Sequence, residues 1–251
     1  MNGDLQLALE LADAADAITL KHFQSATLAV RTKLDMSPVS EADEAVERMI
    51  RERLETERPD DSILGEEFGT TGTGPRRWII DPIDGTKNYV RGIPVYATLI
   101  GVEENGRLSA GVVSAPALGR RWWASRGEGA FCNGKRIRVS QFARLEESHL
   151  TYDSVTDFDQ HGGTVRFLSL LRRCVRARGF GDFWAHMLVA EGAVEIALEP
   201  AVAPWDMAAV QIIVEEAGGR FTDMRGNPRY DGGSALSTNG LVHDAVLEFF
   251  R

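Results

Sequence analysis

The chain has 251 residues, of which 43% are hydrophobic and 26% charged, the composition of a globular protein with a substantial core. Thirty-seven acidic against 28 basic residues give a formal net charge of −9. A field of this sign repels a phosphate backbone and disfavours nucleic-acid binding. Apolar stretches fall short of the roughly 20 residues that a membrane span needs.

The chain start and the cysteines favour a cytoplasmic location. The first residues lack the basic region and the apolar stretch of a secretory signal. Cys132 and Cys174 are isolated cysteines outside any C-x-x-C pair, which is typical of reduced thiols.

Helical patterns open the chain, and strand patterns follow them. Apolar spacing predicts an amphipathic helix over residues 4–24, and a second helix is expected to begin at the cap Ser40 and to end before Pro59. Short buried strands are predicted at 62–65 and 78–81. The Gly/Thr-rich segment 69–75 is predicted to be a loop between these strands. The stretch 96–139 is strand-rich, with hairpin turns predicted at Asn105-Gly106 and Asn133-Gly134.

The second half of the chain is richer in helices. They are predicted at 164–174, 183–192, 205–217 and 244–250. The composition shifts near residues 140–150, from strand-rich to α/β-like. This shift predicts two closely packed halves, 1–145 and 146–251, within one structural unit.

The most informative segment surrounds Asp81-Pro82-Ile83-Asp84. Pro82 holds Asp81 extended, and Asp84 lies three residues further on, so both carboxylates can turn toward one point. Gly85 and Thr86 follow where a helix could begin, which leaves unpaired backbone N–H groups for an anion. Carboxylates beside an anion site suit a hard cation such as Mg²⁺, which is commonly shared with substrate phosphates.

The simpler interpretation of this segment is a pair of turn and capping aspartates. Other acids favour a metal site. Glu66 follows a short apolar strand, Asp43 lies in an acidic helix start, and Asp206 opens an apolar helix. Such acids clustered without a metal would have raised pKa values and would cost stability.

Two other phosphatase signatures fit less well. Haloacid-dehalogenase phosphatases need a nucleophilic Asp two residues before the second Asp, where this chain has Pro82. Cys132 and Arg138 match the C-x₅-R spacing of cysteine phosphatases, but Phe131 replaces their His, and the segment is more typical of a hairpin turn.

Several separated motifs together resemble the inositol monophosphatase family, in order and in spacing. They are Gly65-Glu66-Glu67, the segment from Trp78 to Thr86, Pro204-Trp205-Asp206-Met207-Ala208-Ala209 and Glu215-Glu216-Ala217-Gly218-Gly219. The resemblance covers nearly the whole chain. It implies a layered αβαβα sandwich of the inositol monophosphatase / fructose-1,6-bisphosphatase type, in the α+β or α/β class, and a homodimer.

The resemblance also implies two or three Mg²⁺ ions per active site. Glu66, Asp81 and the carbonyl of Ile83 would hold one ion. Asp81, Asp84 and Asp206 would hold a second, so that Asp81 bridges the two. Most of these ligands lie in the half 1–145, whereas Asp206 and the substrate pocket lie in 146–251.

The remaining catalytic roles come from the same resemblance. Thr86, hydrogen-bonded to Asp43, would activate a water together with Glu66, and the backbone of Gly85 and Thr86 would bind phosphate. Lys33 is similar to the family's lysine on a mobile loop near the metals. A solvated surface lysine is the alternative interpretation.

The substrate pocket departs from the family pattern. By alignment with the family, the segment Gly181-Asp182-Phe183-Trp184 and Glu199 would line it. Members that take inositol phosphates have Gly-Thr-Ala-Ala or Gly-Ser-Ala-Ala at the positions of this segment. Here an acid and two aromatics, Phe183 and Trp184, suit a cationic and partly planar leaving group. L-Histidinol phosphate fits this description.

The segment 178–186 supports the same substrate, because it resembles the histidinol-phosphatase branch known from actinobacteria. The expected activity is therefore hydrolysis of L-histidinol phosphate in histidine biosynthesis. Inositol phosphate, another small sugar or polyol phosphate, or a non-enzymatic protein- or RNA-binding scaffold are the alternatives.

Structural roles are also expected in this segment. Asp182 is a candidate helix N-cap, one of Phe183 and Trp184 is expected in the core, and His186 is expected to be a packed histidine on an apolar helix.

Overall fold

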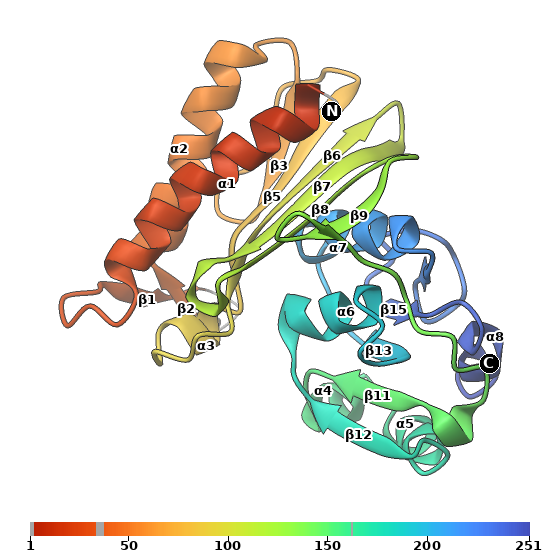
Figure 1. Cartoon of the computed structure of the whole chain (residues 1–251). Coiled ribbons are helices and arrows are strands. Elements are labelled where there is room, and N and C mark those ends of the chain that lie inside the picture. The colour runs from red at the N-terminus through yellow and green to blue at the C-terminus, as the bar shows by residue number, and fades with distance from the viewer. Residues whose placement is uncertain (1–2, 34–37, 162) are drawn as a thin grey trace.

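Five layers stack in the order helices, sheet, helices, sheet, helices (Figure 1). The structure, a computed structural model, describes residues 3–33, 38–161 and 163–251. The arrangement is the αβαβα sandwich expected from the sequence. Among the described residues, no helix is both long enough and apolar enough to cross a bilayer.

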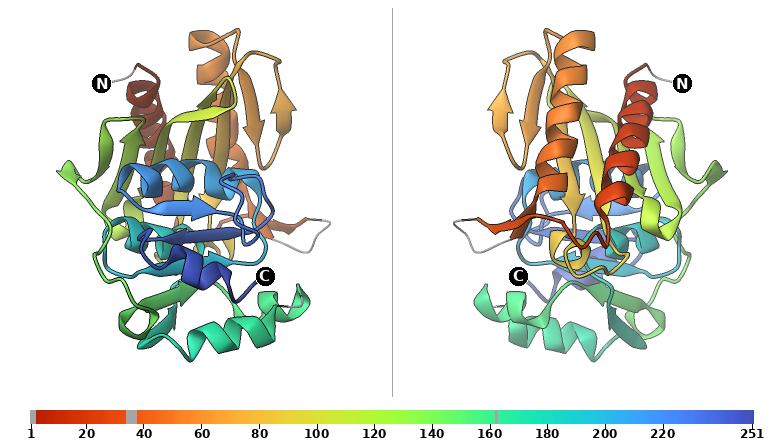
Figure 2. Two further views of the ribbon diagram at one scale, coloured as in Figure 1. Left: turned by 90° about the vertical axis from the view of Figure 1, so that its right-hand side faces the viewer. Right: turned by 90° about the vertical axis from the view of Figure 1, so that its left-hand side faces the viewer.

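Helices form the outer layers and the middle layer. Helices α1 and α2 cover one face of the larger sheet, and α6 and α7 lie between the two sheets (Figures 1 and 2). Helices α4, α5 and α8 cover the far face of the smaller sheet. The helices are α1 (Gly3–His22), α2 (Glu41–Glu57), α3 (Thr86–Tyr89), α4 (Val155–Gln160), α5 (Thr164–Leu171), α6 (Asp182–Ala190), α7 (Pro204–Glu216) and α8 (His243–Leu247), with 3₁₀ turns η1 (Pro116–Leu118) and η2 (Leu145–Glu147).

The larger sheet has eight strands in the order β10-β9-β8-β7-β6-β5-β3-β4, and only its β3–β5 pair is parallel. Its strands are β3 (Ser62–Gly65), β4 (Gly69–Thr71), β5 (Arg76–Asp84), β6 (Ala97–Glu104), β7 (Arg107–Ala115), β8 (Arg120–Ser125), β9 (Gly129–Cys132) and β10 (Lys135–Arg136). A separate two-stranded sheet pairs β1 (Val30–Thr32) with β2 (Pro38–Ser40).

The smaller sheet is mixed, with strand order β12-β11-β13-β15-β14. Its first three strands are parallel, because helices connect them, and β15 runs antiparallel to both of its neighbours. The strands are β11 (His149–Tyr152), β12 (Arg176–Gly179), β13 (Ile196–Glu199), β14 (Arg220–Thr222) and β15 (Ala235–Thr238).

Some local predictions were incomplete. The segment 69–75, expected to be a loop, contains β4, which pairs with β3 as the return strand of a short hairpin. Helix α4 was not predicted, because its six residues are too short for a periodic pattern. Trp122 points into the core, and the adjacent Trp123 is half-buried, as strand alternation requires.

Helix α7 lies unusually close to the larger sheet, at two glycines. Gly101 of β6 and Gly111 of β7 are cross-strand partners beneath this helix. A Cβ atom at Gly101 would lie 2.7 Å from the Cβ of Ala208, and one at Gly111 would lie 2.9 Å from the carbonyl oxygen of Ala209. These glycines let the backbone of α7 approach the sheet, and so they set the position of its N-terminus.

The buried histidine of α8 makes stability depend on pH. His243 is fully buried, and its ring nitrogens lie 3.0 Å from the hydroxyl of Thr222 and 2.9 Å from that of Thr238. Burial, with Arg220 nearby, lowers the pKa of His243 from 6.5 to about 4. The unfolded chain therefore takes up this proton first, so stability present above pH 6.5 is lost as the pH falls toward 4.

We therefore expect His243→Gln to lose less stability on acidification than the unmodified protein. Between pH 7 and pH 5 the difference in the free energy of unfolding should reach about 2 kcal/mol. Urea unfolding at both pH values measures it. Exposed His161 supplies the matched control, His161→Gln. Equal losses in all three proteins would contradict the linkage.

Candidate active site

Asp81 and Asp84 lie at the carboxyl end of β5, where the strand is irregular. In a regular strand, residues three apart point to opposite faces. The register of β5 against β6 shifts between Asp81 and Asp84, and Pro82 between them has no N–H to donate. This bulge turns both carboxylates toward the same place.

Asp206 reaches the same place from the start of α7. One oxygen from each of Asp81, Asp84 and Asp206 lies within 4.8 Å of the others. Asp206 also accepts a hydrogen bond from the backbone N–H of Ala203 at 2.7 Å, which fixes the carboxylate in the first turn of the helix. The segments that contribute the three acids lie more than 120 residues apart in the sequence, as the residue numbers show.

These three carboxyl groups repel one another in a buried environment. Burial and the neighbouring acids raise the pKa values of Asp81 and Asp84 well above the ordinary value, and burial raises that of Asp206 to about 7. In the described part of the chain, Asp81 Oδ1 is buried with no hydrogen-bond partner. Acceptor-only groups with this arrangement suit a cation.

Glu66 and Glu67 follow β3 at the edge of this cluster. The ammonium of Lys33 lies 2.7 Å from a carboxylate oxygen of each, so Lys33 is not a solvated surface residue. These bonds raise the pKa of Lys33, although burial alone would lower it. The backbone N–H of Glu66 donates to the carbonyl of Ile80, the residue before Asp81, at 3.2 Å, and the charge of Glu66 helps to raise the pKa of Asp81.

The turn that carries these two glutamates is held by a buried acid of α2. Glu47 accepts hydrogen bonds from the backbone N–H of Glu67 at 2.7 Å and of Phe68 at 3.1 Å. A Cβ at Gly65 would lie 2.0 Å from an oxygen of Glu47. Gly65 is therefore required for the carboxylate of Glu47 to reach the turn.

Thr86 and Asp43 lie beside the end of β5. The hydroxyl of Thr86 donates to the carbonyl of Ile83 at 2.9 Å, and it lies 3.3 Å from Asp43 Oδ1. The other oxygen of Asp43 accepts from the backbone and the hydroxyl of Ser40, a capping box at the start of α2. Burial raises the pKa of Asp43 to about 6.

The turn before α6 meets the start of α3. A Cβ at Gly85, which has a φ of +80°, would lie 2.9 Å from the carbonyl of Val95 and 3.4 Å from Asp182 Oδ2. Asp182 Oδ2 accepts a hydrogen bond from the side chain of Asn88 at 2.8 Å. Burial and nearby acids, Asp153 first among them, raise the pKa of Asp182 to about 7.

The predicted cap at Asp182 was wrong, because Gly181 is the N-cap of α6. Asp182 is the first helical residue and has a φ of +47°, a conformation that Asp tolerates better than most residues. This backbone points the N–H of Phe183 at Asp84 Oδ2, which accepts it at 2.7 Å. The start of α6 thus holds one of the clustered acids.

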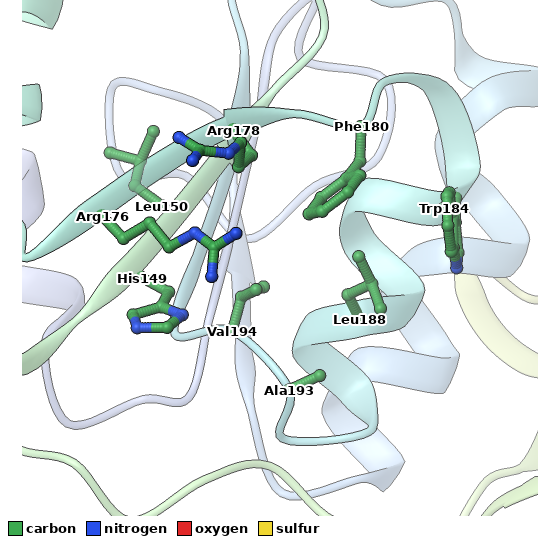
Figure 3. Close-up of a pocket in the computed structure, with 9 residues that line it drawn as sticks. All are labelled: His149, Leu150, Arg176, Arg178, Phe180, Trp184, Leu188, Ala193 and Val194. Atoms are coloured by element: carbon green, nitrogen blue, oxygen red, sulfur yellow. The ribbon is translucent and has the colours of Figure 1, made fainter.

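The two aromatic residues of this segment have different surroundings. Phe183 is fully buried and packs edge-on against Trp122, with ring centroids 6.0 Å apart. Trp184 lines a cavity of about 220 Å³ on the outer side of α6, across from Arg176 and Arg178 (Figure 3). Arginines in the same cavity do not favour a cationic group there, so the acids, not these rings, present the surface that suits a cation.

Glu199 ends β13 on the other side of α6. Its carboxylate lies 2.9 Å from Nε2 of His186, which is a packed histidine as expected. Burial, then the charges of Asp153 and Asp84, raise the pKa of Glu199 well above the ordinary value. The charges of the acidic cluster therefore influence the protonation of Glu199.

Sequence reasoning missed two acids of this region. Asp153 follows β11, and one of its oxygens would lie 2.7 Å from a Cβ at Gly181. Its position directly after an apolar strand was an available signal. Glu67 stands next to Glu66 in the quoted motif, yet only the structure shows that Lys33 contacts both.

The comparisons agree with this geometry. The model of the inositol monophosphatase family matches residues 4–247. The histidinol-phosphatase of Streptomyces coelicolor is 52% identical over 257 aligned residues, which cover 99% of this chain and 97% of that protein. The histidinol-phosphatase of Mycobacterium tuberculosis is also 52% identical, over 97% of this chain and 96% of that protein.

A solved structure shows the same similarity. The Thermotoga maritima IMPase superposes with a TM-score of 0.89 at 35% identity, over 99% of this chain and 96% of that one. The match of the family model to almost the whole sequence, together with these relatives, shows that the chain belongs to the inositol monophosphatase family.

Proposed function

We propose that this protein hydrolyses L-histidinol phosphate to L-histidinol and phosphate, as a Mg²⁺-dependent step of histidine biosynthesis. The observation that carries the proposal is the convergence of Asp81, Asp84 and Asp206 within 4.8 Å. Support for this substrate comes from relatives named histidinol-phosphatase at 52% identity.

The family is generally Mg²⁺-dependent, and the acidic cluster fits such an ion. A hard cation prefers oxygen ligands. Here it would offset the repulsion between the carboxylates and would give Asp81 Oδ1 a partner. Two or three ions would be held by Glu66, Asp81, the Ile83 carbonyl, Asp84 and Asp206. Bound Mg²⁺ would supply positive charge that acidifies water and stabilises the phosphate and the leaving oxygen.

Thr86 and Asp43 are proposed to move the proton of the attacking water, with Glu66. The single hydrogen of the Thr86 hydroxyl can serve the Ile83 carbonyl or Asp43, but not both. When it points at Asp43, it can pass to the Asp43 carboxylate as the Thr86 oxygen takes the proton of the water, so that Thr86 stays neutral. Lys33 would hold Glu66 and Glu67 in place, and the backbone of Gly85 and Thr86 would bind phosphate.

The leaving group would contact the acids around the start of α6. Asp182 is held by Asn88, and Glu199 is held by His186 of α6. Gly181 and the backbone of Phe183 complete the pocket, whereas the ring of Phe183 belongs to the core. Negative charge here suits the ammonium of histidinol better than the hydroxyls of inositol.

Asp182→Asn tests this assignment, because Asn keeps the size and tolerates a positive φ. We expect kcat/KM for histidinol phosphate to fall by about tenfold to a hundredfold, as the loss of one charged contact implies. Turnover of glycerol 2-phosphate should fall less. Phosphate release measures both, and Asp60→Asn, an exposed acid outside the site, is the control.

The same assay on the unmodified protein decides the substrate. Faster turnover of inositol 1-phosphate than of histidinol phosphate would reject the proposed activity in favour of an inositol monophosphatase.

A homodimer and a cytoplasmic location belong to this proposal. The location is supported by Cys132 and Cys174, which are both free thiols. The dimer rests on the family resemblance, and light scattering of the purified protein would test it.

A further inference from the structure

His186 has hydrogen-bond partners on both ring nitrogens. Nε2 lies 2.9 Å from Glu199 Oε1, and Nδ1 lies 2.7 Å from the hydroxyl of Ser237. The ring is fully buried, and its centroid is 6.5 Å from that of Phe221. These contacts define a linear chain of three side chains, Ser237–His186–Glu199.

The fold brings Ser237, His186 and Glu199 together. Glu199 belongs to β13 and Ser237 to β15, and in this antiparallel pair Ser237 is the partner of Ala197. Residues 197 and 199 share a face of β13, so Glu199 and Ser237 lie on the same side of the sheet. Helix α6 covers that side, and its His186 joins the two strands.

Of these three side chains, Glu199 is the one that the acids of the site influence. Its side chain is 10% exposed, whereas that of His186 is fully buried. The charges of Asp153, Asp84, Asp182 and Asp206 all raise the pKa of Glu199 after burial, so its carboxyl group lies within electrostatic range of the acidic region. His186 and Ser237 lie behind it.

The protons of the chain follow from its donors and acceptors. Burial lowers the pKa of His186 to about 3, so its ring is neutral and carries one N–H. Opposite a cationic leaving group Glu199 is ionised and can only accept, which places that hydrogen on Nε2. Nδ1 then accepts from the hydroxyl of Ser237.

We propose that His186 is a positioning residue for substrate selection: its Nε2–H, backed by Ser237, orients the carboxylate of Glu199 toward the cationic leaving group. The identity of the cationic leaving group rests on the proposed function, whereas the hydrogen bonds among Ser237, His186 and Glu199 do not depend on it. Without the donor, a buried carboxylate among other acids is free to rotate or to take up a proton, and its attraction for an ammonium group is lost.

The kinetic test compares two phosphate esters, histidinol phosphate and glycerol 2-phosphate. For His186→Leu, which loses both hydrogen bonds, we expect the ratio of their kcat/KM values to fall by about tenfold, mainly through KM for histidinol phosphate. His186→Gln, which retains an amide donor, should restore part of the ratio. The other buried histidine provides the matched control, His243→Gln, which should leave the ratio unchanged.

A double variant separates positioning from general damage. If His186 acts through Glu199, adding His186→Leu to Glu199→Gln should change the ratio by less than about twofold. An additional tenfold drop in the double variant, or an unchanged ratio in His186→Leu, would overturn the inference.

A second measurement needs no substrate. ¹⁵N NMR of the histidine rings at alkaline pH, which ionises Glu199, should show a neutral His186 ring protonated at Nε2, with the signals assigned by their loss in His186→Leu. A ring protonated at Nδ1 would overturn the inference even in an active enzyme. If the unmodified protein fails to prefer histidinol phosphate, the proposed function is wrong, and the NMR result still decides the role of His186.

Discussion

Asp84→Asn is expected to lower kcat/KM by about a thousandfold or more, while the protein stays folded. If Asp84 is a ligand of the proposed Mg²⁺, its removal would weaken binding of the ion whose charge would stabilise the transition state. Asparagine still offers an oxygen to the N–H of Phe183, which donates to Asp84 at 2.7 Å, so the start of α6 should remain in place. Phosphate release at saturating Mg²⁺ measures the loss.

The same variant should become more stable in the absence of metal. Burial, then the charges of Asp182 and Asp206, raise the pKa of Asp84 well above its ordinary value. A raised pKa in the folded state means that the protonated form favours folding and that this contribution is lost as the pH rises. Asparagine resembles the protonated form, so Tm at pH 8 with EDTA should increase.

Two comparisons complete this test. Excess Mg²⁺ should stabilise the unmodified protein and remove the advantage of Asp84→Asn, whereas Asp60→Asn should change neither Tm nor turnover. Normal hydrolysis by Asp84→Asn would show that Asp84 is not a metal ligand and that the proposed mechanism is wrong.

Gly111→Val is expected to lower the free energy of unfolding by about 3 kcal/mol, the size of a severe overpacking defect. A Cβ here would lie 2.6 Å from Cγ2 of Ile212 and 2.9 Å from the carbonyl oxygen of Ala209. Backbone atoms cannot turn aside as a side chain can, so α7 must move away from the sheet. Urea unfolding measures the loss.

Activity should fall further than the unfolded fraction explains, because the N-terminus of α7 carries Asp206. Gly3→Ala is the matched control, since a Cβ at Gly3 meets nothing within 4 Å. A change below about 0.5 kcal/mol for Gly111→Val, the ordinary range of surface substitutions, would contradict the close approach of α7.

Local patterns in the sequence predicted most of the helices and the position of the acids. Pro82 and the spacing of Asp81 and Asp84 indicated that both carboxylates turn to one point, and the structure brings them together with Asp206. Whether these acids hold Mg²⁺ stays a prediction. Helices and the convergence of Asp81 and Asp84 can be predicted because they depend on residues close together in the sequence.

Features that depend on distant segments were not predictable in this way. The backbone N–H of Phe183 reaches Asp84 across 99 positions, and the Glu199–His186 contact depends on how α6 lies on β13. The order of residue types along the sequence does not indicate where a backbone N–H points in the folded protein. The positive φ of Asp182 was missed for the same reason, since Asp is equally typical of a cap.

Helix α7 has a consequence for folding cooperativity. Eight successive residues, Met207–Val214, are buried, so the helix exposes no water-compatible side along this stretch. One side contacts the eight-stranded sheet, and elsewhere it contacts α6, β14 and β15. A fragment that ends before α7 would leave the covered sheet face open to water, and in the remaining fragment the apolar side of α7 that contacts the larger sheet would be exposed. Separation of the chain at the boundary between its sheets should therefore yield two insoluble pieces, and the intact chain should unfold in a single concerted transition.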